Sequence, residues 1–266
     1  MTLVLDPTPS PTVRPPAETL SLATPGPILF ARFAFPPNRL GLCGPASGDA
    51  LAEHVRGERV DPDLVRMARE FEGAYPYLEL IAGSNAIADP LDARVVEAYW
   101  VGNDLLSGVT PRAHHADLER RFKARASRRE WPWLEAKAGS DALVHHSFHV
   151  LEVLPRIGTM RGELPPALVG ALERCLVRPA RIVAVGGGTI EIAVPPLELR
   201  DGQLRLGTAH IERLEEPTDG GYGDRLLPGD AVAVHWERVC GRLSPAQASS
   251  LLAVTARNIA VANTTI

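Results

Sequence analysis

The sequence has few of the features that mark secreted, membrane or nucleic-acid-binding proteins. Its three cysteines, Cys43, Cys175 and Cys240, are odd in number and widely spaced, which argues against a disulfide framework, and no C-x-x-C pair predicts a structural zinc site. No apolar run is long enough to span a bilayer. The net charge of −4 predicts no basic surface for nucleic acid. The first residues lack the basic start and apolar core of a secretory signal, so we expect a cytoplasmic protein.

What is present divides the 266 residues into regions of different pattern. Residues 1–26 are rich in Pro, Thr and Ser and predict a disordered tail. Residues 27–172 show helical periodicity and predict a helical domain of unknown function, whereas residues 173–266 predict short strands followed by one helix. The sequence therefore predicts an α+β, multi-domain protein, in which a mostly α-helical N-terminal domain precedes a small OB-like β-barrel with a C-terminal helix.

Helix starts are the clearest local signals in the first half. Asp61-Pro62 and Asp89-Pro90 each offer an Asp as N-cap and a Pro at the first helical position, so each predicts the start of a helix. A polar helix is predicted over residues 111–127, and nothing in this half predicts a series of strands.

In the second half the hydrophobic period changes to that of strands. The predicted strands are Pro179–Val185, Thr189–Val194, Leu204–Leu206, His210–Leu214 and Ala231–His235. The glycines at 186–188 predict a tight turn rather than a phosphate loop, because a strand and not a helix follows them. Ser244 and Gln247 have the spacing of a capping box, which predicts a final helix that extends to about Ile259.

Two segments of the second half resemble the HypC-type chaperones of nickel–iron hydrogenase maturation. The segment C-L-V-R-P-A-R-I-V-A-V, which begins at Cys175, is similar to the opening of those proteins. The segment G-D-A-V-A-V-H-W-E-R-V-C-G-R-L-S-P-A-Q-A, which begins at Gly229, is similar to their closing half. The resemblance covers residues 173–260. The whole chain also resembles an uncharacterised bacterial family associated with hydrogenase gene clusters.

The resemblance implies a role for two side chains. By position, Cys175 is the thiol that carries iron, as an Fe(CN)2CO group, and His235 is the imidazole beside it. The implied partners are a HypD-like maturation protein and the hydrogenase large-subunit precursor. The family's cysteine is N-terminal after removal of Met, whereas Cys175 is internal and follows Leu172-Glu173-Arg174. A role for a free amine is therefore lost, while the thiol remains.

The residue types suit this chemistry. Low-spin iron with cyanide and carbonyl ligands favours a soft thiolate. Cationic groups near a thiol favour its ionised form, so we expect Arg174 and Arg178, which flank Cys175, to activate it.

The strand that ends at His235 predicts where the imidazole points. Strand alternation places Val232 and Val234 on one face and Ala231, Ala233 and His235 on the other. If the valines fill the barrel, His235 lies on its outer surface beside small residues, with room for a neighbouring chain.

A second site is predicted in the helical half. If residues 145–149 are helical, His145 and His149 share one face with the spacing of a two-histidine metal site. No Glu completes an H-E-x-x-H motif, so a zinc protease is excluded. Cys43, in a Gly-Pro turn, is a candidate second reactive thiol. Each of these side chains also has a structural interpretation, as a turn residue or a helix end.

Other candidates are better explained by structure than by chemistry. Asp89 and Asp92 suit helix capping more than acid–base catalysis, His114-His115 is expected to face solvent, and Cys240 is expected to be structural.

Two functions follow from the sequence. The first is a non-catalytic accessory protein whose barrel holds the iron group while the helical half docks a partner. The second is a metal-dependent enzyme that uses the region of His145 and His149, with the barrel as docking module. A barrel retained only as a protein-binding scaffold is a third possibility.

Overall fold

A computed structural model describes residues 24–46, 48–128, 130–138, 141–155, 166–216 and 226–264. Residues 1–23 of the predicted disordered tail lie outside these ranges. The first helix begins at Gly26, the last residue of that predicted tail.

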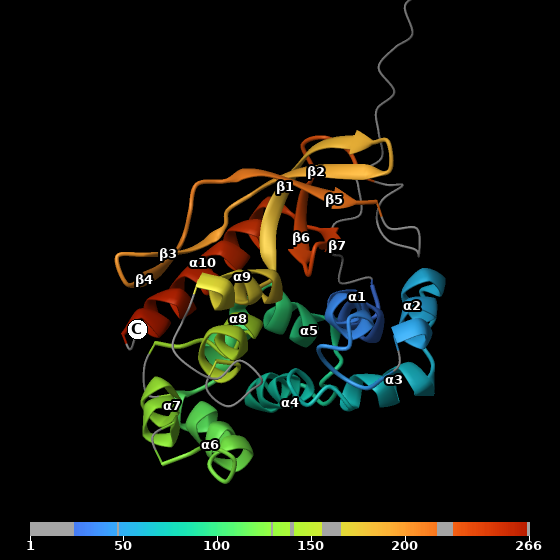
Figure 1. The fold of residues 1–266 in the computed structure, drawn as a ribbon. Coiled ribbons are helices and arrows are strands. Elements are labelled where there is room, and N and C mark those ends of the chain that lie inside the picture. The colour runs from blue at the N-terminus through green and yellow to red at the C-terminus, as the bar shows by residue number, and fades with distance from the viewer. Residues whose placement is uncertain are drawn as a thin grey trace, which may run out of the picture.

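The described part of the first half is helical, as predicted. Its elements are α1 (Gly26–Arg39), α2 (Gly48–Gly57), α3 (Pro62–Arg69), α4 (Tyr75–Ser84), α5 (Ala93–Trp100), η1 (Asp104–Gly108), α6 (Pro111–Phe122), α7 (Glu130–Ala138), α8 (His146–Phe148), the π-helical turn η2 (His149–Val153) and α9 (Pro166–Cys175). Figure 1 shows the strands on one side of the molecule and α1–α8 on the other, with α9 and α10 (Pro245–Asn263) between them.

The helix-start predictions are confirmed in part. Asp61 caps α3 by accepting a hydrogen bond from the Leu64 N–H at 3.0 Å. The predicted start at Asp89-Pro90 is wrong, because Asp92 is the N-cap and its carboxylate accepts from the Arg94 N–H at 2.9 Å. Asp89 instead closes the preceding turn. Asp92 therefore has the capping role that was expected, whereas Asp89 stabilises a turn before the helix.

The strands form an open antiparallel sheet. They are β1 (Arg178–Gly186), β2 (Thr189–Val194), β3 (Leu197–Arg200), β4 (Gln203–Leu206), β5 (His210–Glu215), β6 (Ala231–His235) and β7 (Arg238–Arg242). The five-stranded sheet has the order β5-β2-β1-β6-β7, and β3 and β4 pair separately. The protein is therefore α+β, but in the described residues β5 and β7 are edge strands and the sheet does not close, so the OB-like barrel is not confirmed.

The core runs from the helical half into the sheet. Side chains of α1, α4 and α5 pack in the same hydrophobic cluster as Ala233 of β6 and Cys240 of β7. The opposite sheet face has its own apolar cluster, to which Val232 and Val234 belong. Strand alternation at β6 is thus as predicted, and the face that carries Ala233 packs against helices of the same chain.

The final helix joins the two halves. Ser244 and Gln247 form the predicted capping box at the start of α10, which extends beyond Ile259 to Asn263. Asn258 of α10 is fully buried and donates from its side chain to Ser147 Oγ at 2.8 Å. None of the helices in the described ranges has the length and apolarity needed to cross a membrane.

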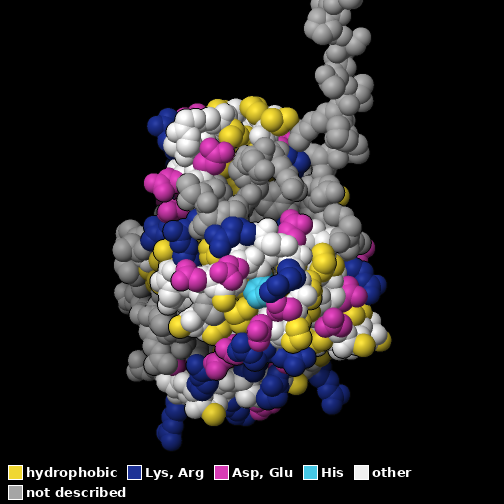
Figure 2. Space-filling model, turned by 90° about the vertical axis from the view of Figure 1, so that its right-hand side faces the viewer, with side chains coloured by type: hydrophobic (Ala, Val, Ile, Leu, Met, Phe, Trp, Pro, Cys, Tyr) yellow, Lys and Arg dark blue, Asp and Glu magenta, His cyan; other side chains and the backbone are white. Residues whose placement is uncertain are grey.

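The surface carries mixed charge. On the face shown in Figure 2, described Lys and Arg side chains alternate with Asp and Glu, and apolar side chains are scattered among them. No charge of one sign dominates the described part of this face.

Candidate functional site

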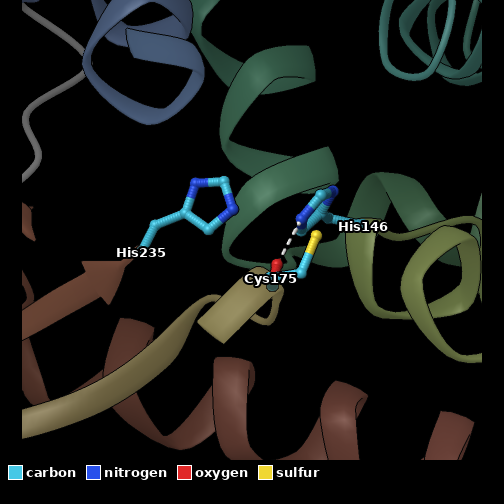
Figure 3. A group of neighbouring side chains, drawn as sticks. All are labelled: His146, Cys175 and His235. Carbon is cyan, nitrogen blue, oxygen red and sulfur yellow. Dashed lines mark hydrogen bonds between the residues drawn. The ribbon is translucent and has the colours of Figure 1, made fainter. Parts of the chain in front are cut away.

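Three potential metal ligands converge where the sheet meets the helices (Figure 3). His146 begins α8, Cys175 ends α9 and His235 ends β6, and one ligand atom from each lies within 4.8 Å of the other two. We call this group the Cys–His–His cluster. It confirms that Cys175 and His235 are close together, and it adds a histidine that the sequence had not indicated.

Backbone contacts explain why these segments meet. The chain turns between β6 and β7 through Trp236 and Glu237, both at positive φ. The Trp236 N–H donates to the Arg174 carbonyl at 3.0 Å. This bond ties the end of β6 to the last turn of α9, and so it sets His235 beside Cys175.

A proline in α1 fixes the orientation of His235. Residue 37 of a regular helix would donate its N–H to the Phe33 carbonyl, but Pro37 has no N–H. The Phe33 carbonyl instead accepts a hydrogen bond from His235 Nδ1 at 2.7 Å. A carbonyl only accepts, so Nδ1 carries the proton and Nε2 holds the lone pair. Among the described residues Nε2 has no hydrogen-bond partner.

His146 is held at both ring nitrogens. Its Nε2 donates to the Cys175 carbonyl at 2.8 Å, and its Nδ1 lies 3.2 Å from the Tyr99 hydroxyl. The Tyr99 hydroxyl also lies 3.1 Å from the Gly73 carbonyl, and its single proton is donated to one of these two acceptors. Each imidazole of the cluster therefore donates to a backbone carbonyl, His146 to that of Cys175 and His235 to that of Phe33.

The cluster lines a cavity of about 210 Å³. Apolar side chains form most of the wall, among them Ala34, Phe71 and Trp100. Cys43 and His149 line the same cavity. The two regions that the sequence suggested as separate sites thus share one space between the helices and the sheet.

Burial keeps the cluster neutral when no metal is bound. It raises the pKa of the Cys175 thiol to about 12, although the Trp236 side chain lowers it somewhat. Burial also lowers the pKa of His235 to about 4, although the Phe33 and Cys175 carbonyls raise it in part. Burial holds the pKa of His146 well below its ordinary value. A buried lone pair without a partner, such as that of His235 Nε2, is costly unless a ligand satisfies it.

The arginines expected to activate Cys175 point elsewhere. Arg178 is buried and makes a bidentate ion pair with Glu212, at 2.7 and 2.9 Å, and a further hydrogen bond to Glu173 at 2.9 Å. Arg174 lies over the Trp236 ring, 5.8 Å from its centroid. Cys175 is the last residue of helix α9, and strand β1 begins only at Arg178. Arg174 and Arg178 therefore do not flank the thiol as they would on one continuous strand.

His235 is not on an outer surface. It is 1% exposed, and its ring centroid lies 5.6 Å from that of Trp100 in the helical half. The expected room for a neighbouring chain is filled by α1 and α5 of this chain.

The helical histidines are also arranged differently from the prediction. His145 is extended and caps α8, accepting at Nδ1 from the Ser147 N–H at 3.0 Å, so it shares no helix face with His149. His149 Nδ1 lies 3.3 Å from the Tyr77 hydroxyl. Burial lowers the pKa of each of these histidines to about 3. Burial raises the pKa of Cys43 to about 11.

Two further predictions concern residues outside the cavity. His114 is buried beside Phe148, with 4.6 Å between ring centroids, so the expected exposure is wrong for this residue. His115 is half-buried and pairs with Glu135 at 3.1 Å. Cys240 is buried in the core, as expected.

Comparison with known proteins gives a family but no function. No curated protein and no solved structure matches the chain. A family model described as a family of unknown function, DUF6390, matches residues 22–266 and so spans the helices, the sheet and the Cys–His–His cluster. The chain belongs to this family.

Proposed function

We propose that the protein is an accessory protein of nickel–iron hydrogenase maturation that holds iron, as the Fe(CN)2CO group, as its cargo. Cys175 and His235 hold the iron, and a HypD-like protein and the hydrogenase large-subunit precursor are its partners in the cytoplasm. The observation that carries this proposal is the pairing of the Cys175 thiol with the unpartnered Nε2 of His235 at the wall of one cavity.

The donor set suits such a cargo. A thiolate is a ligand that electron-rich iron favours, and an imidazole is a second ligand that can be released to another protein. Coordination replaces the thiol proton, which offsets the cost that burial places on the free thiolate. The apolar wall keeps water from the bound group, and about 210 Å³ is more than the volume of a benzene-sized cavity.

The barrel assignment belongs to the same proposal. We infer an OB-like barrel over residues 173–266, preceded by a helical domain over residues 27–172. The apolar cluster shared by β1, β2, β5 and β6 supports this inference, since a barrel requires a core of its own.

Infrared spectroscopy on protein purified anaerobically from its own host tests the proposal. Cyanide and carbonyl stretches are expected in the wild type and are expected to vanish in Cys175→Ser. Cys175→Ala is also expected to abolish hydrogenase maturation. Absence of the stretches from the wild type, in cells that make active hydrogenase, contradicts the proposal.

A metal-dependent enzyme is the second candidate. It is favoured by the position of His149 and Cys43, which line the same cavity as Cys175, so that a small substrate in the cavity contacts both halves. Bound metal that is lost in His149→Gln and kept in His235→Gln, measured on the full chain, supports the enzyme. The reverse pattern supports the carrier.

A further inference from the structure

The third imidazole near Cys175 and His235 comes from the helical half. We propose that His146 is a ligand as well, so that this chain alone provides a Cys–His–His site for a divalent transition-metal ion such as Zn²⁺, Co²⁺ or Fe²⁺. The inference deepens the proposed function, on which it rests for the roles of Cys175 and His235. It makes the helical half part of the metal site.

The donor set determines the class of ion. One thiolate and two imidazoles suit borderline divalent ions of the first transition row, and they are poor ligands for Mg²⁺ or Ca²⁺. Around a four-coordinate ion, three protein ligands leave one position free, as in catalytic zinc sites, whereas structural zinc sites have four protein ligands. Around a six-coordinate iron they leave three positions, one for each diatomic ligand of the proposed Fe(CN)2CO cargo.

The distances are compatible with coordination after small rotations. The ligand atoms lie within 4.8 Å of one another. Around a tetrahedral ion with bonds of about 2.0–2.3 Å, ligand atoms are roughly 3.5 Å apart. A contraction of about 1 Å brings the ligand atoms of the cluster to this geometry.

Hydrogen bonds already orient the two imidazoles. His235 Nδ1–H donates to the Phe33 carbonyl, which leaves Nε2 for the metal. In His146, Nε2 donates to the Cys175 carbonyl, so the ring must turn away from this carbonyl before a metal takes the place of the Nε2 proton. The neutral ring then carries its proton on Nδ1 and donates to Tyr99, whose hydroxyl donates to the Gly73 carbonyl. Metal-bound histidines in proteins usually have such a partner at the other nitrogen.

The proton balance of this arrangement is simple. The Cys175 thiol loses its proton to solvent when the metal binds, and His146 exchanges one tautomer for the other without a change of charge. The two ligand histidines thus bind as neutral imidazoles and the cysteine as a thiolate, the forms that metal ligation requires.

The free coordination position faces the apolar cavity. Phe71, Trp100 and Ala34 line it, so a charged exogenous ligand gains little there. A water molecule, or a small diatomic ligand that is uncharged or whose charge the metal offsets, fits this position. Cys43 and His149 line the same cavity but are outside the group whose ligand atoms converge.

The test is a Co²⁺ titration of the reduced, metal-free, full-length protein without oxygen. Thiolate-to-cobalt charge-transfer absorption is expected to saturate at one equivalent. His146→Gln is expected to weaken binding by at least about 100-fold, because it removes a ligand and not only an outer partner. The matched control is His149→Gln, which removes an imidazole from the same cavity wall and is expected to leave the affinity unchanged. Circular dichroism and thermal melts of both metal-free variants verify that they fold.

A second pair of variants keeps all three ligands. Tyr99→Phe removes the hydroxyl that supports His146 and is expected to weaken Co²⁺ binding about 10-fold or more. Tyr77→Phe removes the equivalent hydroxyl beside His149 and is expected to have no effect.

The outcomes separate this inference from the proposed function. Unaltered Co²⁺ affinity in both His146→Gln and Tyr99→Phe overturns the inference, even if cyanide and carbonyl stretches are found. Tight binding that depends on His146, without those stretches, supports the three-ligand site and refutes the iron cargo.

Discussion

Replacing Pro37 with alanine tests whether helix α1 orients His235. The substitution restores an N–H at residue 37, within hydrogen-bonding reach of the Phe33 carbonyl in a regular helix. This carbonyl currently accepts the bond from His235 Nδ1 at 2.7 Å. The new donor competes with His235, so we expect the imidazole to lose its fixed tautomer and direction.

The magnitude follows from known effects on metal sites and helices. Loss of a partner that orients a ligating histidine costs about 10–100-fold in metal affinity, or roughly 1.4–2.8 kcal/mol. Removing a proline from a helix interior favours the helix by up to about 3 kcal/mol. Metal binding is therefore expected to weaken while the metal-free fold keeps or gains stability, and a general loss of folding cannot produce this pair of effects.

The assay compares Pro37→Ala with Pro36→Ala. Both prolines are buried in the same helix, but only Pro37 lies one helical hydrogen bond from Phe33. Zn²⁺ affinity is measured by competition with a chelator, and the His235 tautomer by nitrogen NMR of the imidazole. An unchanged Nδ1–H tautomer with unchanged affinity in Pro37→Ala, or an equal loss of affinity in both variants, refutes the reasoning.

Three further predictions concern stability. Burial lowers the pKa of His114 from 6.5 to about 4. Below pH 6.5 the His114 imidazole binds a proton in the unfolded state but not in the folded state. The free energy of unfolding therefore falls as the pH drops from 6.5 towards 4. His114→Gln is expected to reduce the loss of unfolding free energy between pH 7 and pH 5 by about 2 kcal/mol in urea titrations, and a pH dependence equal to that of the wild type contradicts this. Ser244→Ala removes the capping box of α10 and is expected to lower the unfolding free energy by about 1 kcal/mol, against no change for the exposed Ser249→Ala; a difference below measurement error refutes the role of the cap. Arg178→Gln leaves Glu212 without its bidentate partner and is expected to cost about 3 kcal/mol, while the exposed Arg181→Gln has little effect; similar denaturation midpoints for the two show that the ion pair is unimportant.

The strands that were predicted correctly carry both alternation and turn signals. The glycine turn before Thr189 identifies the β1–β2 hairpin, and the bounds of β2 and β6 agree with the prediction. Strand β7 was missed because its hairpin turns through Trp236-Glu237, at φ of 47° and 60°, where such a turn normally has Asn or Gly. Strain of this kind is typical of functional sites, and here it lies beside Cys175 and His235.

The site could be predicted only as far as local pattern extends. Cys175 and His235 were identified because short segments around them resemble a known family. His146 was missed because His145 and His149 have the familiar helical spacing, whereas an extended residue 145 and a π-helical turn place His146 towards the sheet. Long-range contacts of His146 with the Cys175 carbonyl and the His235 ring select this histidine, and no local period encodes such contacts.

X-ray absorption spectroscopy at the metal edge tests the central claim most directly, on full-length protein purified anaerobically from its own host. We expect one sulfur neighbour at about 2.3 Å and two imidazole nitrogens per metal, with the sulfur absent in Cys175→Ser and one imidazole absent in His146→Gln. A metal-free protein, or a metal surrounded only by oxygen and nitrogen in the wild type, contradicts it.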